Sequence, residues 1–176
     1  MTRIGLISDT HNFLDDAVFK HFDQCDEVWH AGDFGTAAEV ADKLKAFKPF
    51  KGVYGNIDGR DIRDEYPEKL IWMCEDVKVF MTHIGGYPPK YVPGVREELF
   101  AEQPKLFICG HSHILKVLYD EKLQCLHMNP GAAGKHGWHK VRTLIRFVID
   151  GDRMKDCEAI ELGGEVGGVV RTDGCK

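Results

Sequence analysis

The feature that most constrains the fold is an alternation, in the first third of the chain, between short apolar runs and amphipathic stretches. Three runs have the pattern of buried strands: Arg3–Ser8, Glu27–His30 and Phe50–Tyr54. Between them the apolar spacing predicts two helices, Asp15–Phe22 and Thr36–Ala46, the second capped by Thr36. This βαβαβ order is typical of parallel strands with helices packed on the faces of the sheet.

The second half of the chain has a different pattern. Two adjacent runs, Leu70–Cys74 and Val77–Thr82, predict a hairpin that turns at Glu75-Asp76. A helix is expected at Val95–Glu102. Further strands with mostly short connections are expected at Leu106–Cys109, Leu115–Tyr119, Gln124–Met128, Val141–Ile149 and Met154–Leu162. We therefore predict an α/β domain over residues 1–162 whose second half is mostly antiparallel.

The last segment, residues 163–176, is rich in glycine and poor in large apolar side chains, so we expect a flexible C-terminal tail. The whole length of 176 residues suits one hydrophobic core rather than two.

Composition excludes several classes of function. The formal net charge is -5, so bulk attraction to nucleic acid is not indicated. No apolar stretch reaches the roughly 18–20 residues that span a bilayer, and the strand-like start carries no signal-peptide pattern. We expect a cytoplasmic protein with no membrane contact. Its six cysteines include no CxxC pair, so neither disulfides nor thiolate zinc is expected.

Residues of the kinds that bind metals lie just beyond the C-terminal ends of five predicted strands. They are Asp9, His11, Asp33, Asn56, His83, His111 and His113. In open α/β sheets, ligands bind in the crevice beyond these strand ends, because the loops converge there. We therefore expect these side chains to meet at one rim. Taken singly, each has a structural alternative: a turn residue at Asp9 or Asn56, a helix cap at Asp33, a buried histidine at His83.

Two carboxylates, four imidazoles and one amide suit Mn, Fe, Zn or Ni better than calcium or magnesium. Seven ligands exceed one metal site that also leaves room for substrate, so we expect two divalent ions that share a bridging carboxylate. Two such ions about 3.5–4 Å apart can clamp the attacking and leaving oxygens of an in-line displacement. Their excess positive charge over two carboxylates favours an anionic phosphoester substrate.

These residues stand in short motifs: Asp9-Thr10-His11, Gly32-Asp33, Gly55-Asn56-Ile57-Asp58, His83, and Gly110-His111-Ser112-His113. In this order, the set resembles the calcineurin-like metallophosphoesterases. It is most similar to their small branch of bacterial and archaeal phosphodiesterases, which also includes the eukaryotic retromer subunit Vps29. Asn129-Pro130-Gly131 matches a further loop of that branch, and the likeness covers residues 1–162.

The resemblance implies a sandwich of two mixed β-sheets flanked by helices. It implies that one metal is bound by Asp9, His11, Asp33 and His113. The second metal would be bound by Asp33, Asn56, His83 and His111, with Asp33 as the bridge. Manganese is the expected metal, with Ni, Zn, Fe or Co as alternatives. By analogy, a hydroxide bridging the metals attacks phosphorus, and Asp33, Asn56, Asp58 and His83 are expected to act in catalysis.

The sequence departs from the family pattern at two positions. Many larger relatives have a histidine after the asparagine that helps to protonate the leaving group, and this chain has Ile57 there. Substrates with poor leaving groups should then react slowly, unless Asp58, His136, His139 or a metal-bound water supplies the proton. Relatives usually also have a second histidine two residues after His83, where this chain has Gly85, so occupancy of both metal sites stays open.

Other residues have a structural and a functional interpretation. Arg60 and Arg63 belong to a charged run and are either solvated ion-pair partners or phosphate ligands. His30 is expected to be packed behind the metal ligands, and His127 to be structural. The segment Gly134–Lys140 is either a surface loop or a pocket wall through His136, Trp138 and His139. The aromatic residues Phe13, Phe34 and Tyr87 lie near the motif loops and either shape the pocket or serve as ordinary packing.

Three functions compete. The first is a metal-dependent phosphoesterase, specifically a phosphodiesterase acting on a small phosphoester. The second is a metal-binding but catalytically idle scaffold resembling Vps29, which the isoleucine at position 57 favours. The third is a metal store or sensor, which lacks support because the chain has no cysteine ligand pattern and no helix-turn-helix. The intact ligand set favours the enzyme, and the branch makes a homodimer plausible.

Overall fold

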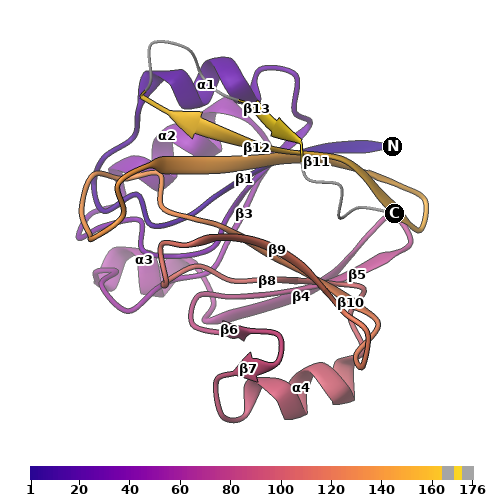
Figure 1. Cartoon of the computed structure of the whole chain (residues 1–176). Coiled ribbons are helices and arrows are strands. Elements are labelled where there is room, and N and C mark those ends of the chain that lie inside the picture. The colour runs from indigo at the N-terminus through magenta and orange to yellow at the C-terminus, as the bar shows by residue number, and fades with distance from the viewer. Residues whose placement is uncertain (164–168, 172–176) are drawn as a thin grey trace.

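Two β-sheets face one another in the computed structural model, with helices on their outer sides (Figure 1). The structure describes residues 1–163 and the backbone of residues 169–171. The first sheet has the strand order β13 (Val169–Arg171), β12 (Arg153–Leu162), β11 (Arg142–Asp150), β1 (Thr2–Ile7), β2 (Glu27–His30), β3 (Phe50–Gly52). The second has the order β4 (Lys69–Cys74), β5 (Val77–Thr82), β8 (Leu106–Ile108), β10 (Cys125–Pro130), β9 (Leu115–Asp120). The predicted sandwich of two mixed sheets is confirmed.

The first half follows the predicted βαβαβ order. Strand β1 pairs in parallel with β2, with Leu6 opposite Trp29, and β2 pairs in parallel with β3, with His30 opposite Gly52. The crossovers carry α1 (Asp16–Phe22) and α2 (Glu39–Phe47). The C-terminal ends of β1, β2 and β3 therefore lie along one edge of the first sheet.

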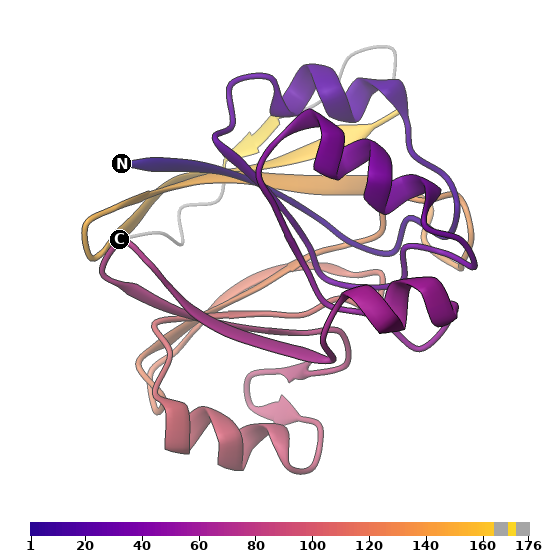
Figure 2. The same ribbon diagram turned by 180° about the vertical axis from the view of Figure 1, so that it is seen from behind.

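The hydrophobic core has three layers. Between the sheets, Leu6 and Trp29 pack with Met81 and Ile108 of the second sheet. Outside the first sheet, a second cluster includes Phe22 of α1. Its other members include Val28, Phe34 and Leu44. A third cluster lies under α4 (Val95–Glu102) on the outer face of the second sheet and includes Phe80, Leu99 and Phe107. Burying one such side chain contributes about 1.5–3 kcal/mol. Figure 2 shows α1 and α2 on one side of the paired sheets and α4 on the other.

The second half is less antiparallel than predicted. The hairpin of β4 and β5 turns at Glu75-Asp76, as expected, and β11 and β12 join through a short turn at Gly151-Asp152. However, β8 pairs in parallel with both β5 and β10. As a result, the C-terminal ends of β5 and β8 also point to a common edge.

One helix boundary was predicted wrongly. Helix α2 begins at Glu39 rather than Thr36, and its N-cap, Ala38, makes no side-chain capping bond. Thr36 lies in the preceding loop, where its backbone N–H donates to Oδ1 of Asn12 at 2.9 Å. This tertiary contact outweighs the local capping preference of threonine.

Four short elements were not predicted as such. Helix α3 (Arg60–Glu65) occupies the charged run after Asn56, and β6 (Gly86–Tyr87) pairs with β7 (Lys90–Tyr91) in a small ribbon. In the segment predicted to be a flexible tail, the backbone of β13 pairs antiparallel with β12, with Val170 opposite Ala159. The rest of that prediction falls outside the described residues. Within the described part of the chain, no helix is long and apolar enough to cross a membrane.

Candidate metal centre

The predicted metal ligands lie together at the shared edge of the two sheets. Asp9 and His11 follow β1, Asp33 follows β2 and Asn56 follows β3. His83 follows β5, and His111 and His113 follow β8. The structure brings all of these side chains together, six of them in two groups of potential metal ligands.

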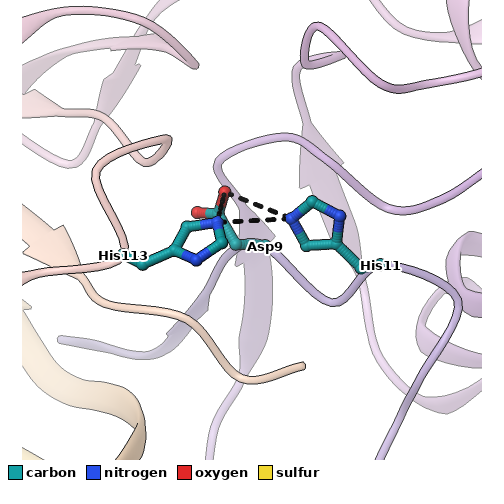
Figure 3. Close-up of side chains that lie close together, drawn as sticks. All are labelled: Asp9, His11 and His113. Atoms are coloured by element: carbon teal, nitrogen blue, oxygen red, sulfur yellow. Dashed lines mark hydrogen bonds and ion pairs between the residues drawn. The ribbon is translucent and has the colours of Figure 1, made fainter. Parts of the chain in front are cut away.

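The first group contains Asp9, His11 and His113, whose side chains point toward one another (Figure 3). Oδ1 of Asp9 lies 3.1 Å from Nε2 of His113. The two imidazole Nε2 atoms are 3.3 Å apart, and Nε2 of His11 lies 3.9 Å from Oδ1 of Asp9. Three potential ligand atoms therefore surround one point.

The second group contains Asp33, His83 and His111, with Asn56 beside them. Nε2 of His83 lies 3.2 Å from Oδ2 of Asp33 and 3.2 Å from Oδ1 of Asn56. Nδ1 of His111 lies 2.9 Å from the same Asn56 oxygen. This set matches the predicted members of the second metal site.

Asp33 lies between the two groups. Its Oδ2 is 3.2 Å from Nε2 of His83 and 3.7 Å from Nε2 of His11. The other oxygen, Oδ1, accepts a hydrogen bond from the backbone N–H of Ile57 at 3.0 Å, which holds the carboxylate in this orientation. Asp33 therefore lies where a bridging carboxylate would have to lie, and its bridging role stays a prediction.

The oxygen and nitrogen atoms of the two groups lie where a bound cation would satisfy them better than they satisfy one another as hydrogen-bond partners. Oδ1 of Asp9 is buried and has no hydrogen-bond partner, although Oδ2 accepts from Ser8 and from the backbone of His111. A buried carboxylate oxygen without a partner is costly unless a proton or metal ion compensates it. Nδ1 of His83 donates to the carbonyl of Ala31 at 2.8 Å, so the Nε2 atom of neutral His83 turns a lone pair toward Asp33. Mixed nitrogen and oxygen donors of this kind suit a divalent transition metal.

The surroundings of four predicted ligands shift their pKa values, and the direction and cause differ among them. Burial alone would raise the pKa of Asp33, but the hydrogen bond and charge of His83 and the N–H of Ile57 outweigh it and lower the pKa. Burial would likewise lower the pKa of His83, but the hydrogen bond that its charged form donates to Asp33 and the charges of Asp9 and Asp33 raise it. Burial lowers the pKa values of His11 and His111, despite the nearby carboxylates. Neutral imidazole is the form that binds metals.

The backbone of the ligand loops is strained. Five of the predicted ligands have positive φ angles: Asp9 (54°), His11 (46°), Asp33 (59°), His111 (66°) and His113 (58°). Non-glycine residues rarely adopt this left-handed region, and each instance costs on the order of 1 kcal/mol or more. Such strain clusters at functional sites, and here the surrounding hydrogen bonds maintain it.

His30 lies behind the ligands and is fully buried. Its Nδ1 accepts from the backbone N–H of Gly32 at 3.1 Å, so Nε2 carries the hydrogen and donates to Oγ1 of Thr10 at 3.0 Å. The ring stacks on Phe34 with the centroids 3.7 Å apart, and burial holds its pKa well below the ordinary value. His30 thus joins the loop after β1 to the loop after β2, as its packed interpretation predicts.

Both carboxylate oxygens of Asp58 accept hydrogen bonds from backbone N–H groups. Its Oδ2 accepts from the N–H groups of Asp33 (3.0 Å) and Gly55 (2.7 Å), and its Oδ1 accepts from Gly35 (2.8 Å). Burial raises the pKa of Asp58, although these hydrogen bonds oppose the shift. Both oxygens are committed, so the geometry gives Asp58 a positioning role for the Asp33 and Asn56 loops rather than a free carboxyl for proton transfer.

Sequence reasoning missed two supports of the centre. Oγ of Ser8 donates to Oδ2 of Asp9 at 2.6 Å, which leaves Oδ1 to face the imidazoles. Nδ2 of Asn129 donates to the carbonyl of Gly110 at 2.8 Å and so shapes the loop that carries His111 and His113. Asn129 belongs to a motif that was recognised without a role, whereas Ser8 gives no signal beyond its place at a strand end.

A cleft of about 530 Å³ opens over the ligands. Its walls include the predicted pocket residues His136, Trp138 and His139, together with Ile57 and Ile114. Trp138 is fully exposed, and Ile114 is 56% exposed. The cleft therefore has apolar side chains beside the predicted ligands.

The two arginines predicted as alternatives differ in their contacts. Arg63 donates through Nε to the carbonyl of Asp58 at 2.8 Å and through Nη2 to the carbonyls of Gly55 and Asn56 at 3.0 Å each. Its guanidinium stacks 4.6 Å from the ring centroid of Tyr54. Arg60 is an exposed partner of Asp64 on α3. Arg63 therefore supports the Asn56 loop, and Arg60 follows its ion-pair interpretation.

Comparisons with known proteins gave one family match. The family model described as the calcineurin-like phosphoesterase superfamily domain matches residues 2–152. A search among curated proteins found no relative similar in sequence.

Several solved structures share the fold. Vacuolar protein sorting 29 (Vps29) of Cryptosporidium parvum has a TM-score of 0.80 at 18% identity and covers 99% of this chain and 98% of its own. Wild-type Vps29 of Entamoeba histolytica complexed with Zn²⁺ has a TM-score of 0.77 at 15% identity, with 97% and 98% covered. An archaeal phosphodiesterase has a TM-score of 0.69 at 22% identity, with 91% and 99% covered. At these identities the structural likeness establishes the fold alone.

Proposed function

The chain belongs to the calcineurin-like phosphoesterase superfamily, and we propose that it is a metal-dependent phosphodiesterase that uses two divalent ions. One observation carries the proposal. The buried, unpartnered Oδ1 of Asp9 and the Oδ2 of Asp33 both face imidazole Nε2 atoms, which leaves two adjoining points where a cation is needed.

The ligand sets follow from the two groups and from Asp33 between them. One ion would be held by Asp9, His11, Asp33 and His113. The other would be held by Asp33, Asn56, His83 and His111. Manganese is the expected metal, and the zinc complex of an Entamoeba Vps29 shows that a similar fold binds a divalent ion of this class.

Bound ions would supply Lewis acidity, which activates water at neutral pH and offsets charge on the phosphoryl oxygens. The protein positions the reaction. Asp58 and Arg63 fix the loop that carries Asn56, and Ala31 fixes the ring of His83. The backbone N–H of Ile57 holds Asp33 in place.

The cleft favours a diester over a monoester. Its described lining residues include histidines, Ser112 and apolar side chains but no lysine or arginine. A monoester carries about two negative charges at neutral pH, whereas a diester carries one. A cleft without side-chain cations is better matched to the single charge. Its apolar walls suit the organic groups of a small phosphodiester.

The rate of hydrolysis should depend strongly on the acidity of the leaving group. Ile57 lies beside Asn56 in the cleft and cannot donate a proton, and both oxygens of Asp58 accept backbone hydrogen bonds. Diesters with acidic leaving groups, such as nitrophenol, need no proton donor and should react fastest.

The second candidate is a metal-binding scaffold without catalysis. The structural likeness to Vps29 and the isoleucine at position 57 favour it. The strained ligand loops favour the enzyme, because a scaffold has no need to hold five ligands at positive φ. A cytoplasmic location and a homodimer stay predictions.

The test is hydrolysis of bis-p-nitrophenyl phosphate by metal-depleted protein to which Mn²⁺ has been restored. We expect turnover that stops on chelation and is largely lost in Asp33→Asn and His83→Ala. Asp120→Asn serves as the matched control, because that carboxylate accepts from the Tyr91 hydroxyl outside the centre. Absence of turnover with Mn, Ni, Co and Zn, while metal is bound, would support the scaffold instead. Equal turnover in the Asp33 and His83 variants would place any activity elsewhere.

A further inference from the structure

We propose that His139 is a positioning residue of the metal centre, which holds His113 in the tautomer whose Nε2 can bind a metal ion. His139 lies in the loop between β10 and β11 and is not among the predicted ligands. The inference rests on the proposed metal-dependent function, but it concerns a hydrogen position that can be measured without turnover.

The hydrogen-bond partners of His139 determine its own tautomer. Nε2 of His139 lies 2.9 Å from the carbonyl oxygen of Gly134. A carbonyl oxygen only accepts hydrogen bonds, so Nε2 must carry the hydrogen. In neutral His139 the other ring nitrogen, Nδ1, then has a lone pair.

That lone pair faces His113. The Nδ1 atoms of His139 and His113 are 3.2 Å apart, within hydrogen-bonding distance. Because Nδ1 of neutral His139 can only accept, the shared hydrogen must belong to Nδ1 of His113. Neutral His113 then has its lone pair on Nε2, which lies 3.1 Å from Oδ1 of Asp9 and 3.3 Å from Nε2 of His11.

The opposite arrangement would disable the site. If Nδ1 of His139 carried a hydrogen instead, it would donate to His113, and the hydrogen of His113 would lie on Nε2. That hydrogen would then point at Oδ1 of Asp9 and occupy the place of an ion. The choice of tautomer is therefore also a choice between a metal and a proton.

The conformation of the loop at Gly137 allows the rings of His113 and His139 to come into contact. The ring centroids are 5.1 Å apart and the rings are nearly perpendicular. A Cβ atom on Gly137 would lie 2.3 Å from Nδ1 of His113 and 3.0 Å from Nδ1 of His139, so only glycine leaves room for the contact. Gly137 also has a φ of +129°, which side-chain-bearing residues rarely adopt.

The contacts of His139 connect it to Asp9 through two routes, one through Gly134 and one through His113. The backbone N–H of Gly134 donates to the carbonyl of Asp9 at 3.0 Å, and the carbonyl of Gly134 accepts from His139. His139 accepts from His113, and Nε2 of His113 faces the Asp9 side chain. Asp9, Gly134, His139 and His113 thus form a closed circuit around the first group. Outer partners of this kind commonly alter metal affinity by about 10- to 100-fold.

The test compares two substitutions of His139. His139→Asn keeps an acceptor close to the position of Nδ1, whereas His139→Leu removes it. His21→Ala, a change to a histidine of α1, serves as the control. Nitrogen NMR of the metal-free protein reports which ring nitrogen of His113 carries the hydrogen.

We expect the hydrogen on Nδ1 of His113 in the wild type, in His139→Asn and in the control, and a shift toward Nε2 in His139→Leu. Chelator competition with Mn²⁺ should show one site weakened by about 10- to 100-fold in His139→Leu, and by much less in His139→Asn. A hydrogen on Nε2 in the wild type, or unchanged tautomer and affinity in His139→Leu, would overturn the proposal. The wild-type spectrum decides even if a variant fails to fold. Bound metal without hydrolysis would reject the proposed enzyme and leave this inference standing.

Discussion

Oδ1 of Asp9 and Nε2 of His113 lie 3.1 Å apart in a buried environment, and the carboxylate oxygen has no hydrogen-bond partner. The two residues are separated by most of the domain in sequence, since one follows β1 and the other follows β8. Their proximity requires both sheets to be in place. The centre is therefore a product of the sandwich rather than of any local segment.

Asp9→Asn should reduce metal binding from two ions to one. The substitution preserves shape but removes the charge of the only carboxylate within the group of Asp9, His11 and His113. Elemental analysis of metal-restored protein measures the stoichiometry, with Asp120→Asn as the remote control. Two ions bound with unchanged affinity would show that Oδ1 of Asp9 is not a ligand.

Asp58→Asn should destabilise the metal-free protein by about 2 kcal/mol, because an amide nitrogen would replace one acceptor of the backbone N–H groups. Urea denaturation measures the free energy of unfolding. Asp61→Asn, at an exposed position of α3, should change it by less than about 0.5 kcal/mol. Equal changes in the free energy of unfolding for the two substitutions would show that Asp58 has no positioning role.

His127→Leu should make stability less sensitive to acid. Burial lowers the pKa of His127 to about 4, and neither ring nitrogen has a hydrogen-bond partner. The unfolded chain therefore takes up a proton below about pH 6.5, while the folded protein does not until about pH 4. Stability that is present near pH 7 falls as the pH falls through this window, by about 2 kcal/mol at pH 5 for this residue.

The measurement is the free energy of unfolding of metal-free wild type and His127→Leu at pH 7 and at about pH 5, followed by urea denaturation. Chelation removes the contribution of metal ligands, and the other shifted histidines are common to both proteins. The difference between the two proteins should grow in favour of the variant as the pH falls. A constant difference would show that His127 is protonated, or paired, in the folded state.

Ile57→His should accelerate hydrolysis of diesters with alkyl leaving groups and leave nitrophenyl esters nearly unchanged. The side chain at position 57 lines the cleft next to Asn56 and is 36% exposed, so a histidine there can reach the leaving oxygen. General acids contribute roughly 10²- to 10⁴-fold, and a partly aligned donor should give at least about tenfold. Comparing kcat/KM for both substrate types separates proton donation from a general change in binding; Ile57→Phe is the control.

Trp138→Ala should raise KM for aryl-substituted diesters without affecting folding. The indole is fully exposed on the cleft wall, so its removal costs no packing but does remove a surface for the substrate. Aromatic contacts are worth about 0.5–1.5 kcal/mol, which corresponds to a two- to tenfold rise. Phenyl and methyl p-nitrophenyl phosphates share a leaving group, and only the phenyl ester should respond. Tyr119→Ala removes an exposed aromatic residue outside the cleft and should have no effect.

The sequence could place the predicted ligands at one edge because parallel strands impose a direction. Once Arg3–Ser8, Glu27–His30 and Phe50–Tyr54 are assigned as parallel, the residues that follow them must share an edge. The same logic applies to His83 and His111, although the parallel pairing of β5 with β8 was not foreseen. The type of each ligand and its strand end were sufficient for a candidate site.

Hydrogen positions and tertiary contacts could not be predicted in this way. The role of His139 depends on an approach of 3.2 Å between two loops, and Thr36 fails as a cap because Asn12 bonds to its backbone. Helix α3 was hidden because its charged sequence also suits an exposed loop, and the anchoring of Asp58 depends on where three backbone N–H groups point. These features follow from packing between distant segments.

Stability and function make opposite demands on five residues of the candidate centre. These residues have left-handed backbone conformations: Asp9, His11, Asp33, His111 and His113. Glycine at any of these positions would relax the local conformation while deleting a ligand. A screen for heat tolerance alone should therefore enrich variants that have lost the centre. A library screened for both properties would instead gain its stability far from this edge, in the helices and the outer layers.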